Sequence, residues 1–406
     1  MQVCMTKNSG IRRMKTRNLA ILATALSSGA AYAQSSVTLF GLIDTGIAYT
    51  SNARSDPAVP SKGGTNWSMI TGIINTSRWG LHGNESLGDG LSAIFWLESG
   101  FDSTNGAFKN GGDLFGRQAW VGVASHEYGS VTLGRQYDLV VDYLAPISAT
   151  GSGFAANLAQ HPYDNDNLNN NMRLNNAVKF SSAAFDGLQV GAMYAFSNEA
   201  GGFSNNNAYS LGARYARGPV TVSAAFLQVN RNAGQPNPSG AASTTDGDAL
   251  TTGGRLQIYG AGAQYAFGKS SVGLVWTHSS TEDVTGILQG GSTTIGALHG
   301  HGIKFDNFEV NGQYFVMPAF SVGASYVYTM ASFEPLAGTT ARPHWNQVMA
   351  QANYRLSPRT EVFLEGTYQR VSGGNGNPVF DAGVFNLPPS TGSSQTVVTV
   401  GLQHRF

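Results

Sequence analysis

Alternation of apolar and polar side chains at every second residue runs through this chain and constrains its fold more than any other feature. The C-terminal stretch VVTVGLQHRF places Val398, Val400, Leu402, His404 and Phe406 on one face of an extended strand. The intervening positions are mostly small or polar. A period of two residues is that of a β-strand whose two faces meet different surroundings.

The same alternation returns along the rest of the chain, in VTLFGLIDTGIAY from Val37, LSAIFWLES from Leu91 and LQVGAMYAF from Leu188. Further stretches with this period begin at Val220, Val272, Phe320 and Val362. Charged residues make up only 12% of the chain, against roughly 25% in a typical soluble domain, and 52 residues are glycine. This composition favours an all-β protein with many strands and turns.

The N-terminus has the features of a secretory signal. Five basic residues precede an apolar run at residues 19–26, and Ala31-Tyr32-Ala33 forms an A-x-A cleavage site. A spanning helix would need roughly 20 apolar residues, so we interpret residues 1–33 as a signal peptide that is removed. Residues 34–406 then form the mature domain. Its 19 basic and 24 acidic residues give a formal net charge of −5, which argues against a nucleic-acid partner.

The connections between the alternating stretches are short and long in turn. Seven short ones have the composition of hairpin turns, at residues 87–90, 126–130, 185–187, 217–219, 267–270, 317–319 and 357–359. Eight longer loops, polar and rich in Gly, Asn and Ser, would complete the connection of sixteen strands. A soluble β-sandwich needs no such alternation, whereas a transmembrane barrel has turns at one end and loops at the other. We therefore predict a 16-stranded antiparallel transmembrane β-barrel with a water-filled lumen.

Several stretches in order resemble the general porins of the Gram-negative outer membrane. These are SSVTLFGLID, SRWGLHGNESLGDGLSAIFWLESGF, GRQAWVGVAS, GSVTLGRQYD, RLNNAVKFSS and VGLQHRF, which together span essentially the whole mature chain. The resemblance implies a homotrimer embedded in outer-membrane lipid, with the third long loop of each barrel folded inward. It also implies that Leu402, His404 and Phe406 form the C-terminal signal read by the barrel assembly machinery.

By this resemblance, residues 138–172 are the constriction loop, and a cluster of arginines on the barrel wall lies opposite it. Alternation places Arg78 on the lumen face, and it places Arg173 and Lys179 together on the lumen face of another strand. Arg117 is ambiguous by alternation, so we place it inward on resemblance alone. A basic wall facing an acidic loop would set up a field that filters solutes by charge. Alternatively, these residues are only the polar lining of a wet barrel.

The loop departs from the family pattern in its charges. Residues 144–162 contain no acid, which leaves Asp138 and Asp142 before this segment and Asp164 and Asp166 after it. We count Asp138 and Asp142 among the constriction residues. Because the narrowest part of the pore would then be net positive, we expect an anion-preferring or weakly selective channel.

No motif in the chain indicates an enzyme, a metal or another cofactor. GSGFAA at residues 151–156 lacks the flanking strand and helix of a dinucleotide site. DNDNLN at residues 164–169 begins like a calcium loop but has Leu168 at a ligand position, so we interpret it as a solvated turn that could hold a cation only loosely. We expect passive diffusion of small hydrophilic solutes and ions. The alternatives are a substrate-preferring channel, or a barrel enzyme or adhesin acting through its long loops.

Overall fold

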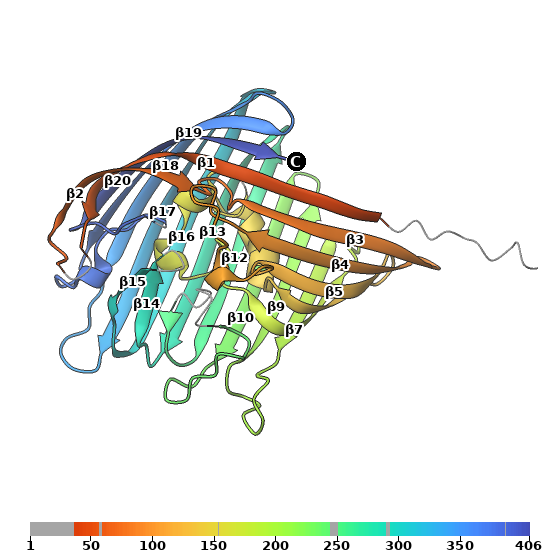
Figure 1. Ribbon diagram of the computed structural model, residues 1–406, viewed down its shortest axis with the longest axis horizontal. Coiled ribbons are helices and arrows are strands. Elements are labelled where there is room, and N and C mark those ends of the chain that lie inside the picture. The colour runs from red at the N-terminus through yellow and green to blue at the C-terminus, as the bar shows by residue number, and fades with distance from the viewer. Residues whose placement is uncertain (1–35, 57–58, 153, 244–250, 290–292, 386) are drawn as a thin grey trace, which may run out of the picture.

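The computed structural model describes residues 36–56, 59–152, 154–243, 251–289, 293–385 and 387–406. The predicted signal peptide, residues 1–33, lies outside the described residues. The strands run obliquely around a closed barrel, and a coiled segment from the middle of the chain lies inside it (Figure 1). No helix in the described part of the chain is long and apolar enough to cross a membrane.

Seventeen strands form the barrel wall. They are β1 Ser36–Arg54, β2 Gly63–Thr71, β3 Arg78–Gly88, β4 Leu91–Gly100, β5 Gln118–Ser125, β6 Gly129–Gln136, β7 Leu174–Ser182, β8 Leu188–Ala195, β9 Asn207–Arg217, β10 Val220–Asn230, β12 Leu256–Phe267, β13 Ser270–Glu282, β16 Gly300–Met317, β17 Phe320–Pro335, β18 His344–Arg355, β19 Thr360–Ser372 and β20 Ser394–Arg405. Three further strands, β11 Thr251–Thr252, β14 Gly286–Gln289 and β15 Thr293–Ala297, form a small separate sheet.

The seventeen strands occupy sixteen positions because β2 and β3 share one of them. β1 pairs with β3 along its first half, from Ser36↔Asn84 to Leu42↔Arg78, and with β2 along its second half. On its other edge β1 pairs with the C-terminal strand β20, which closes the cylinder without a free edge. The structure thus confirms the predicted 16-stranded antiparallel barrel and adds a break in its second position.

The break between β2 and β3 is held by one carboxylate. Residues 72–77 leave the sheet here, and the fully buried Asp44 of β1 accepts hydrogen bonds from their backbone N–H groups. These donors are the amides of Ile73 at 2.9 Å, Ile74 at 3.0 Å and Asn75 at 2.9 Å. Gln403 of β20 adds a fourth bond at 2.9 Å, so Asp44 also joins the detour to the strand that closes the barrel.

The connections alternate in length as the sequence predicts. All seven short turns join neighbouring strands, and the longer loops all leave and rejoin the wall at the other end of the barrel. We call these two ends the turn end and the loop end. In transmembrane barrels of outer membranes the short turns face the periplasm and the long loops face outward.

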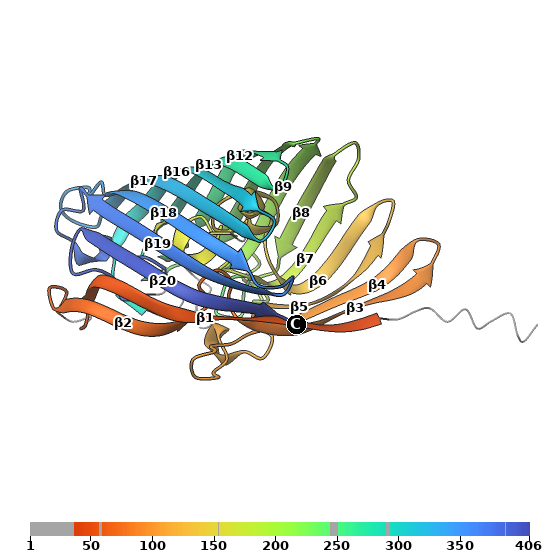
Figure 2. The ribbon, with the colours of Figure 1, turned by 90° about the horizontal axis from the view of Figure 1, so that it is seen from above.

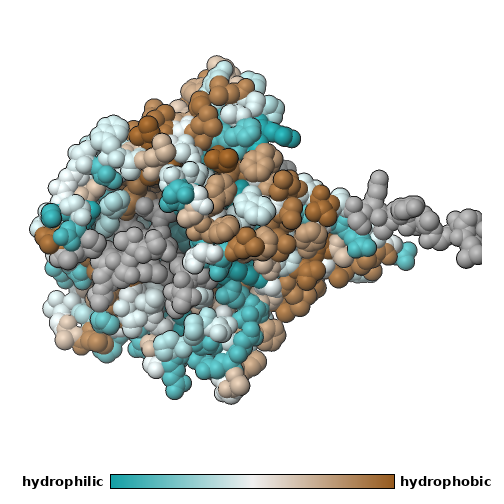
Figure 3. Space-filling view, viewed as in Figure 1, coloured by the Kyte–Doolittle hydropathy of each residue, from teal (hydrophilic) through white to brown (hydrophobic). Residues whose placement is uncertain are grey.

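The outer surface of the wall is apolar with aromatic side chains toward both ends. Ile43 and Ile47 of β1 are 41% and 48% exposed, whereas the intervening Asp44 is fully buried. Apolar side chains cover the wall around β1 and β3–β5 (Figure 3). Exposed aromatic residues near the turn end are Tyr128, Phe185, Tyr215, Tyr265, Phe267, Tyr314, Tyr354 and Phe406, and those toward the loop end include Trp67, Tyr209, Tyr259, Trp276 and Tyr368. Two such girdles are typical of barrels that span a bilayer.

The third long loop, between β6 and β7, enters the lumen. It contains the short helical turns η2 Val140–Leu144, η3 Ala145–Ile147, η4 Ala156–Ala159 and η5 Pro162–Asp164. Leu144 and Ile147 are fully buried in a cluster with inward-facing residues of the wall such as Leu227 and Ile258. The inward-folded loop expected from the sequence is therefore present, and it divides the interior instead of leaving an open cylinder (Figure 2).

We expect Asp44→Asn to destabilise the barrel by about 2 kcal/mol, since an amide cannot satisfy all the donors that the carboxylate binds. Urea unfolding of the protein in lipid vesicles, followed by tryptophan fluorescence, measures this change. Asp89→Asn is the matched control because Asp89 is exposed in the β3–β4 turn at φ 50°, where asparagine fits equally well. Equal stability of the two variants would contradict the anchoring role of Asp44.

Candidate functional site: the loop-lined lumen

A buried histidine ties the third loop to the far wall. Nδ1 of His161 lies 2.6 Å from Oδ2 of Asp166 in the same loop, and Nε2 lies 2.9 Å from Oε2 of Glu309 on β16. The side chains of all three residues are fully buried. The other oxygen of Glu309 accepts a hydrogen bond from the backbone amide of Ala149 at 2.7 Å. One wall carboxylate thus holds the loop at two places.

The charge state of this cluster follows from its two acids. Burial alone would lower the pKa of His161, but the charges of Asp166 and Glu309 and their hydrogen bonds raise it to about 10. Burial would raise the pKa of Asp166, yet the histidine charge and hydrogen bonds from His161 and Thr277 hold it below its ordinary value. His161 is therefore an imidazolium between two carboxylates at neutral pH.

Residues 164–169 are a buried part of the loop and not the solvated turn that their composition suggests. Asp164, Asp166 and Asn167 are each fully buried. Asp164 accepts hydrogen bonds from the amides of Asn169 at 2.8 Å and Asn171 at 3.2 Å. Short polar side chains are used here to satisfy the backbone of a loop without regular structure. In the described residues no group of three or more His, Cys, Asp or Glu could hold a metal ion.

Arginines from β3 and from the start of β5 meet at Glu98 of β4. Its Oε1 lies 2.5 Å from Nε of Arg117 and 3.5 Å from Nη1 of Arg78. Its Oε2 accepts hydrogen bonds from Trp96 at 2.8 Å and Gln118 at 3.1 Å. Arg117 is almost fully buried with a side-chain exposure of 2%, whereas 23% of the Arg78 side chain is exposed.

The third predicted arginine, Arg173, joins this group through Tyr137. Arg117 donates to the Tyr137 hydroxyl at 2.7 Å, and the Arg173 guanidinium lies 5.5 Å from the centre of the same ring. Arg173 also donates to the backbone oxygen of Asn171 at 2.7 Å. Arg78, Arg117 and Arg173 therefore form one cluster beside the two ends of the third loop.

The remaining predicted residues lie at the root of the loop. Lys179 of β7 forms an ion pair with Asp142 at 2.7 Å and donates to the backbone oxygen of Tyr137 at 2.9 Å. Asp138 is fully buried, and it accepts hydrogen bonds from the Val140 amide and from Asn167, both at 2.7 Å. Burial and the charge of Asp142 raise the pKa of Asp138 to about 6. Its carboxylate therefore faces the interior of the loop and not the water of the lumen.

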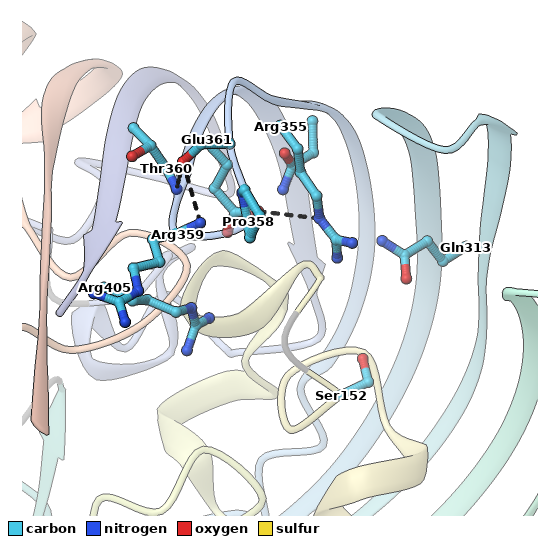
Figure 4. Close-up of a pocket in the computed structure, with 10 residues that line it drawn as sticks. Ser152, Gln313, Arg355, Pro358, Arg359, Thr360, Glu361 and Arg405 are labelled. Atoms are coloured by element: carbon cyan, nitrogen blue, oxygen red, sulfur yellow. Dashed lines mark hydrogen bonds and ion pairs between the residues drawn. The ribbon is translucent and has the colours of Figure 1, made fainter.

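A second group of arginines lies at the turn end of the lumen and was missed at the sequence level. Arg355, Arg359 and Arg405 line a polar cavity of about 310 Å³ next to Ser152 of the third loop (Figure 4). Alternation alone could have found Arg405, because it shares the polar face of the last strand with Gln403. Arg359 lies in a turn, where alternation predicts no direction for a side chain.

Comparison with known proteins agrees with this architecture. The family model of the Gram-negative porins matches residues 19–374 of the chain.

The chain belongs to the Gram-negative porin family.

The porin is similar to an outer membrane porin protein of Bordetella pertussis, with 32% identity over alignments that cover 97% of this chain and all of that protein. It is also 29% identical to outer membrane porin protein 32 of Delftia acidovorans, over 96% of this chain and 99% of the relative. Among solved structures, an anion-selective porin from Comamonas acidovorans matches with a TM-score of 0.66 and 22% identity, covering 92% of this chain and all of that one. The protein is thus an outer-membrane porin that forms a diffusion channel.

We expect His161→Gln to loosen the third loop, because the substitution leaves Asp166 and Glu309 buried without a counter-charge at a cost of about 3 kcal/mol. Noise and amplitude of single-channel currents should both rise relative to the native porin. His126→Gln, an exposed change in the β5–β6 turn, is the control.

The contribution of His161 to the stability of the third loop decreases as the pH rises. Because the pKa of His161 is raised to about 10, its contribution is complete below the ordinary histidine value of about 6.5 and is lost as the pH rises through 10. Currents of the native porin should therefore be steady across neutral pH and become noisier near pH 10. If the single-channel currents of the native porin and of His161→Gln have equal noise and amplitude below that pH, His161 does not hold the third loop to the wall.

Proposed function

We propose that this porin is a homotrimeric channel that lets small hydrophilic solutes cross the outer membrane and prefers anions. The observation that carries the preference is the state of the loop acids. Asp138, Asp164 and Asp166 are buried, and Asp142 is paired with Lys179. Water in the lumen therefore meets little negative charge from the loop.

Positive charge on the wall reaches the water of the lumen at two places. Arg78, whose side chain is 23% exposed, lies beside Glu98, and Arg355, Arg359 and Arg405 line the cavity at the turn end, where Glu361 is the one carboxylate among the described lining residues. A lumen with excess guanidinium groups attracts anions and repels cations, even though the mature chain has a formal net charge of −5. The description of the Comamonas acidovorans relative as anion-selective agrees with this proposal.

A homotrimer is supported by the outer surface. The loop between β4 and β5 projects outward from the wall, on the side where apolar residues cover β1 and β3–β5 (Figures 2 and 3). Phe108 and Leu114 in this loop are 47% and 50% exposed, as expected of groups that contact a neighbouring subunit. One structural neighbour, a Vibrio cholerae outer membrane protein, is described as a trimer.

Export and assembly complete the proposal. Residues 1–33 would direct secretion and be removed, so that the mature protein begins at Gln34. Leu402 and His404 lie on the exposed outer face of β20, and the exposed Phe406 follows directly after the strand. This exposed stripe is where the barrel assembly machinery would recognise the last strand before it pairs with β1.

We expect an anion-favouring reversal potential for the purified porin in planar bilayers under a potassium chloride gradient. Arg78→Gln should reduce the preference, because Arg78 is the most exposed of the three clustered arginines whose contacts the structure describes. Arg217→Gln, an exposed change in the β9–β10 turn, serves as the control. A clear cation preference that persists after Arg78 and Arg173 are both neutralised would refute the proposal.

We expect Phe406→Ala to lower the yield of folded trimer in the outer membrane several-fold, since it removes the terminal aromatic of the proposed signal. The heat-dependent shift in gel mobility measures folded trimer. Leu356→Ala removes a similarly exposed apolar side chain at the turn end and should leave the yield unchanged. Equal yields for both variants would show that Phe406 has no special part in assembly.

A further inference from the structure

The cavity at the turn end is lined by residues of β16, β18, β19 and β20, by the β18–β19 turn and by the third loop. Arg355 ends β18, Arg359 lies in the turn to β19, and Arg405 ends β20. Gln313 of β16 and Ser152 of the loop face them across the cavity (Figure 4). A volume of about 310 Å³ is at the small end of the range for sites that hold small ligands.

The charges in this cavity are not balanced. Glu361 is its one carboxylate among the described lining residues, and it lies 3.8 Å from Nε of Arg355. In the part of the chain that the structure describes, neither Arg359 nor Arg405 has a carboxylate within ion-pairing distance. Arg359 and Arg405 therefore line the cavity without an ion-pairing carboxylate from the described residues.

Strand register places these arginines in one band with Arg78. The amide of Arg405 donates to the backbone oxygen of Arg359 at 2.8 Å, and Arg355 is paired with Glu361 across β18 and β19. On the other side of Arg405, the β1 residue Leu42 pairs with both Arg405 and Arg78. Arg405 and Arg78 are thus about 10 Å apart in backbone position, one on each side of β1. The band leads from the turn end to the Glu98 cluster.

We propose that the cavity of Arg355, Arg359 and Arg405 binds small doubly charged oxyanions on their way through the channel. Arg359 and Arg405 supply two positive charges that match two negative charges on the ligand. Amide and hydroxyl groups of Gln313, Asn353 and Ser152 add neutral hydrogen-bonding groups around it. The inference deepens the proposed anion preference and rests on it, since the ligand must reach the cavity through an anion-permitting lumen.

The chemistry of guanidinium narrows the class of ligand. Its planar fork of N–H donors matches the paired oxygens of a carboxylate or a phosphate group. Chloride and a monocarboxylate can neutralise only one of the two free guanidinium groups. Small dicarboxylates and inorganic phosphate carry the charge for both, so we expect them to bind more tightly than singly charged anions of similar size.

Calorimetry on the full-length mature porin in detergent tests this proposal with malonate and inorganic phosphate as probes and acetate as the singly charged comparison. We expect at least one of the two dianions to bind the native porin more tightly than acetate. The response to each probe separates dicarboxylate from phosphate as the preferred ligand. Arg359→Gln should weaken the binding by about tenfold through loss of a charge-assisted hydrogen bond.

One control variant and one further test variant make the result decisive. Arg217→Gln removes an exposed arginine of another turn, paired with Asp186 at 3.5 Å, and should leave dianion binding unchanged. Arg405→Gln should weaken binding as Arg359→Gln does, and the heat-dependent gel shift verifies that each variant is folded. Should Arg405→Gln fail to fold because of its place beside the C-terminus, Arg359→Gln alone decides.

Failure of this site and failure of the proposed selectivity give different results. Absent dianion binding, or equal binding by the native porin and Arg359→Gln, would overturn the site whatever the reversal potential. A cation-favouring reversal potential would instead overturn the anion preference, while calorimetry on protein in detergent would still report on the cavity. Tight dianion binding together with an anion-favouring potential supports both.

Discussion

The need to pair every backbone polar group within the bilayer determines the rest of this structure. Hydrocarbon offers no hydrogen bonds, so the strands must close on themselves, and β1 achieves this by pairing with β20 along one edge and with β2 and β3 along the other. At residues 72–77, where the described wall breaks between β2 and β3, the chain turns inward and its backbone N–H groups are bound by the carboxylate of Asp44. The irregular backbone of this break thus lies on the lumen side.

Backbone polar groups of the third loop must also be hydrogen-bonded, because this loop lies inside the barrel. Its acids serve the loop itself: Asp138 and Asp164 bind backbone and side-chain N–H groups, while Asp166 and Glu309 hold the His161 cation. Acids used in this way contribute little field to the water around them. Arg78 and the arginines at the turn end then supply the positive charge that meets the lumen water, which links a structural requirement of the loop to the proposed selectivity of the channel.

Alternation predicted the strands and placed Arg78 on the lumen face, because side chains on a strand must alternate between lipid and lumen. The composition of the connections predicted the seven short turns. Arg117 shows where that reasoning ends: both faces of its segment are apolar, and only the ion pair with Glu98 shows its direction. The acids of residues 164–169 show a second limit. Their composition resembles that of a solvated turn, yet wall residues such as Thr277 and Asn307 bury them.

By itself the sequence determined that this chain would be an antiparallel barrel with polar and apolar faces, since periodicity is a local property that any strand displays. Only the tertiary structure decided which charges are free. Ion pairs such as Arg117 with Glu98, or Lys179 with Asp142, join residues that are distant in the chain, whereas no carboxylate of the described residues forms an ion pair with Arg359 or Arg405. The pairing of charged side chains inside the barrel depends on strand register and on the path of the third loop. A two-residue repeat in the sequence predicts neither.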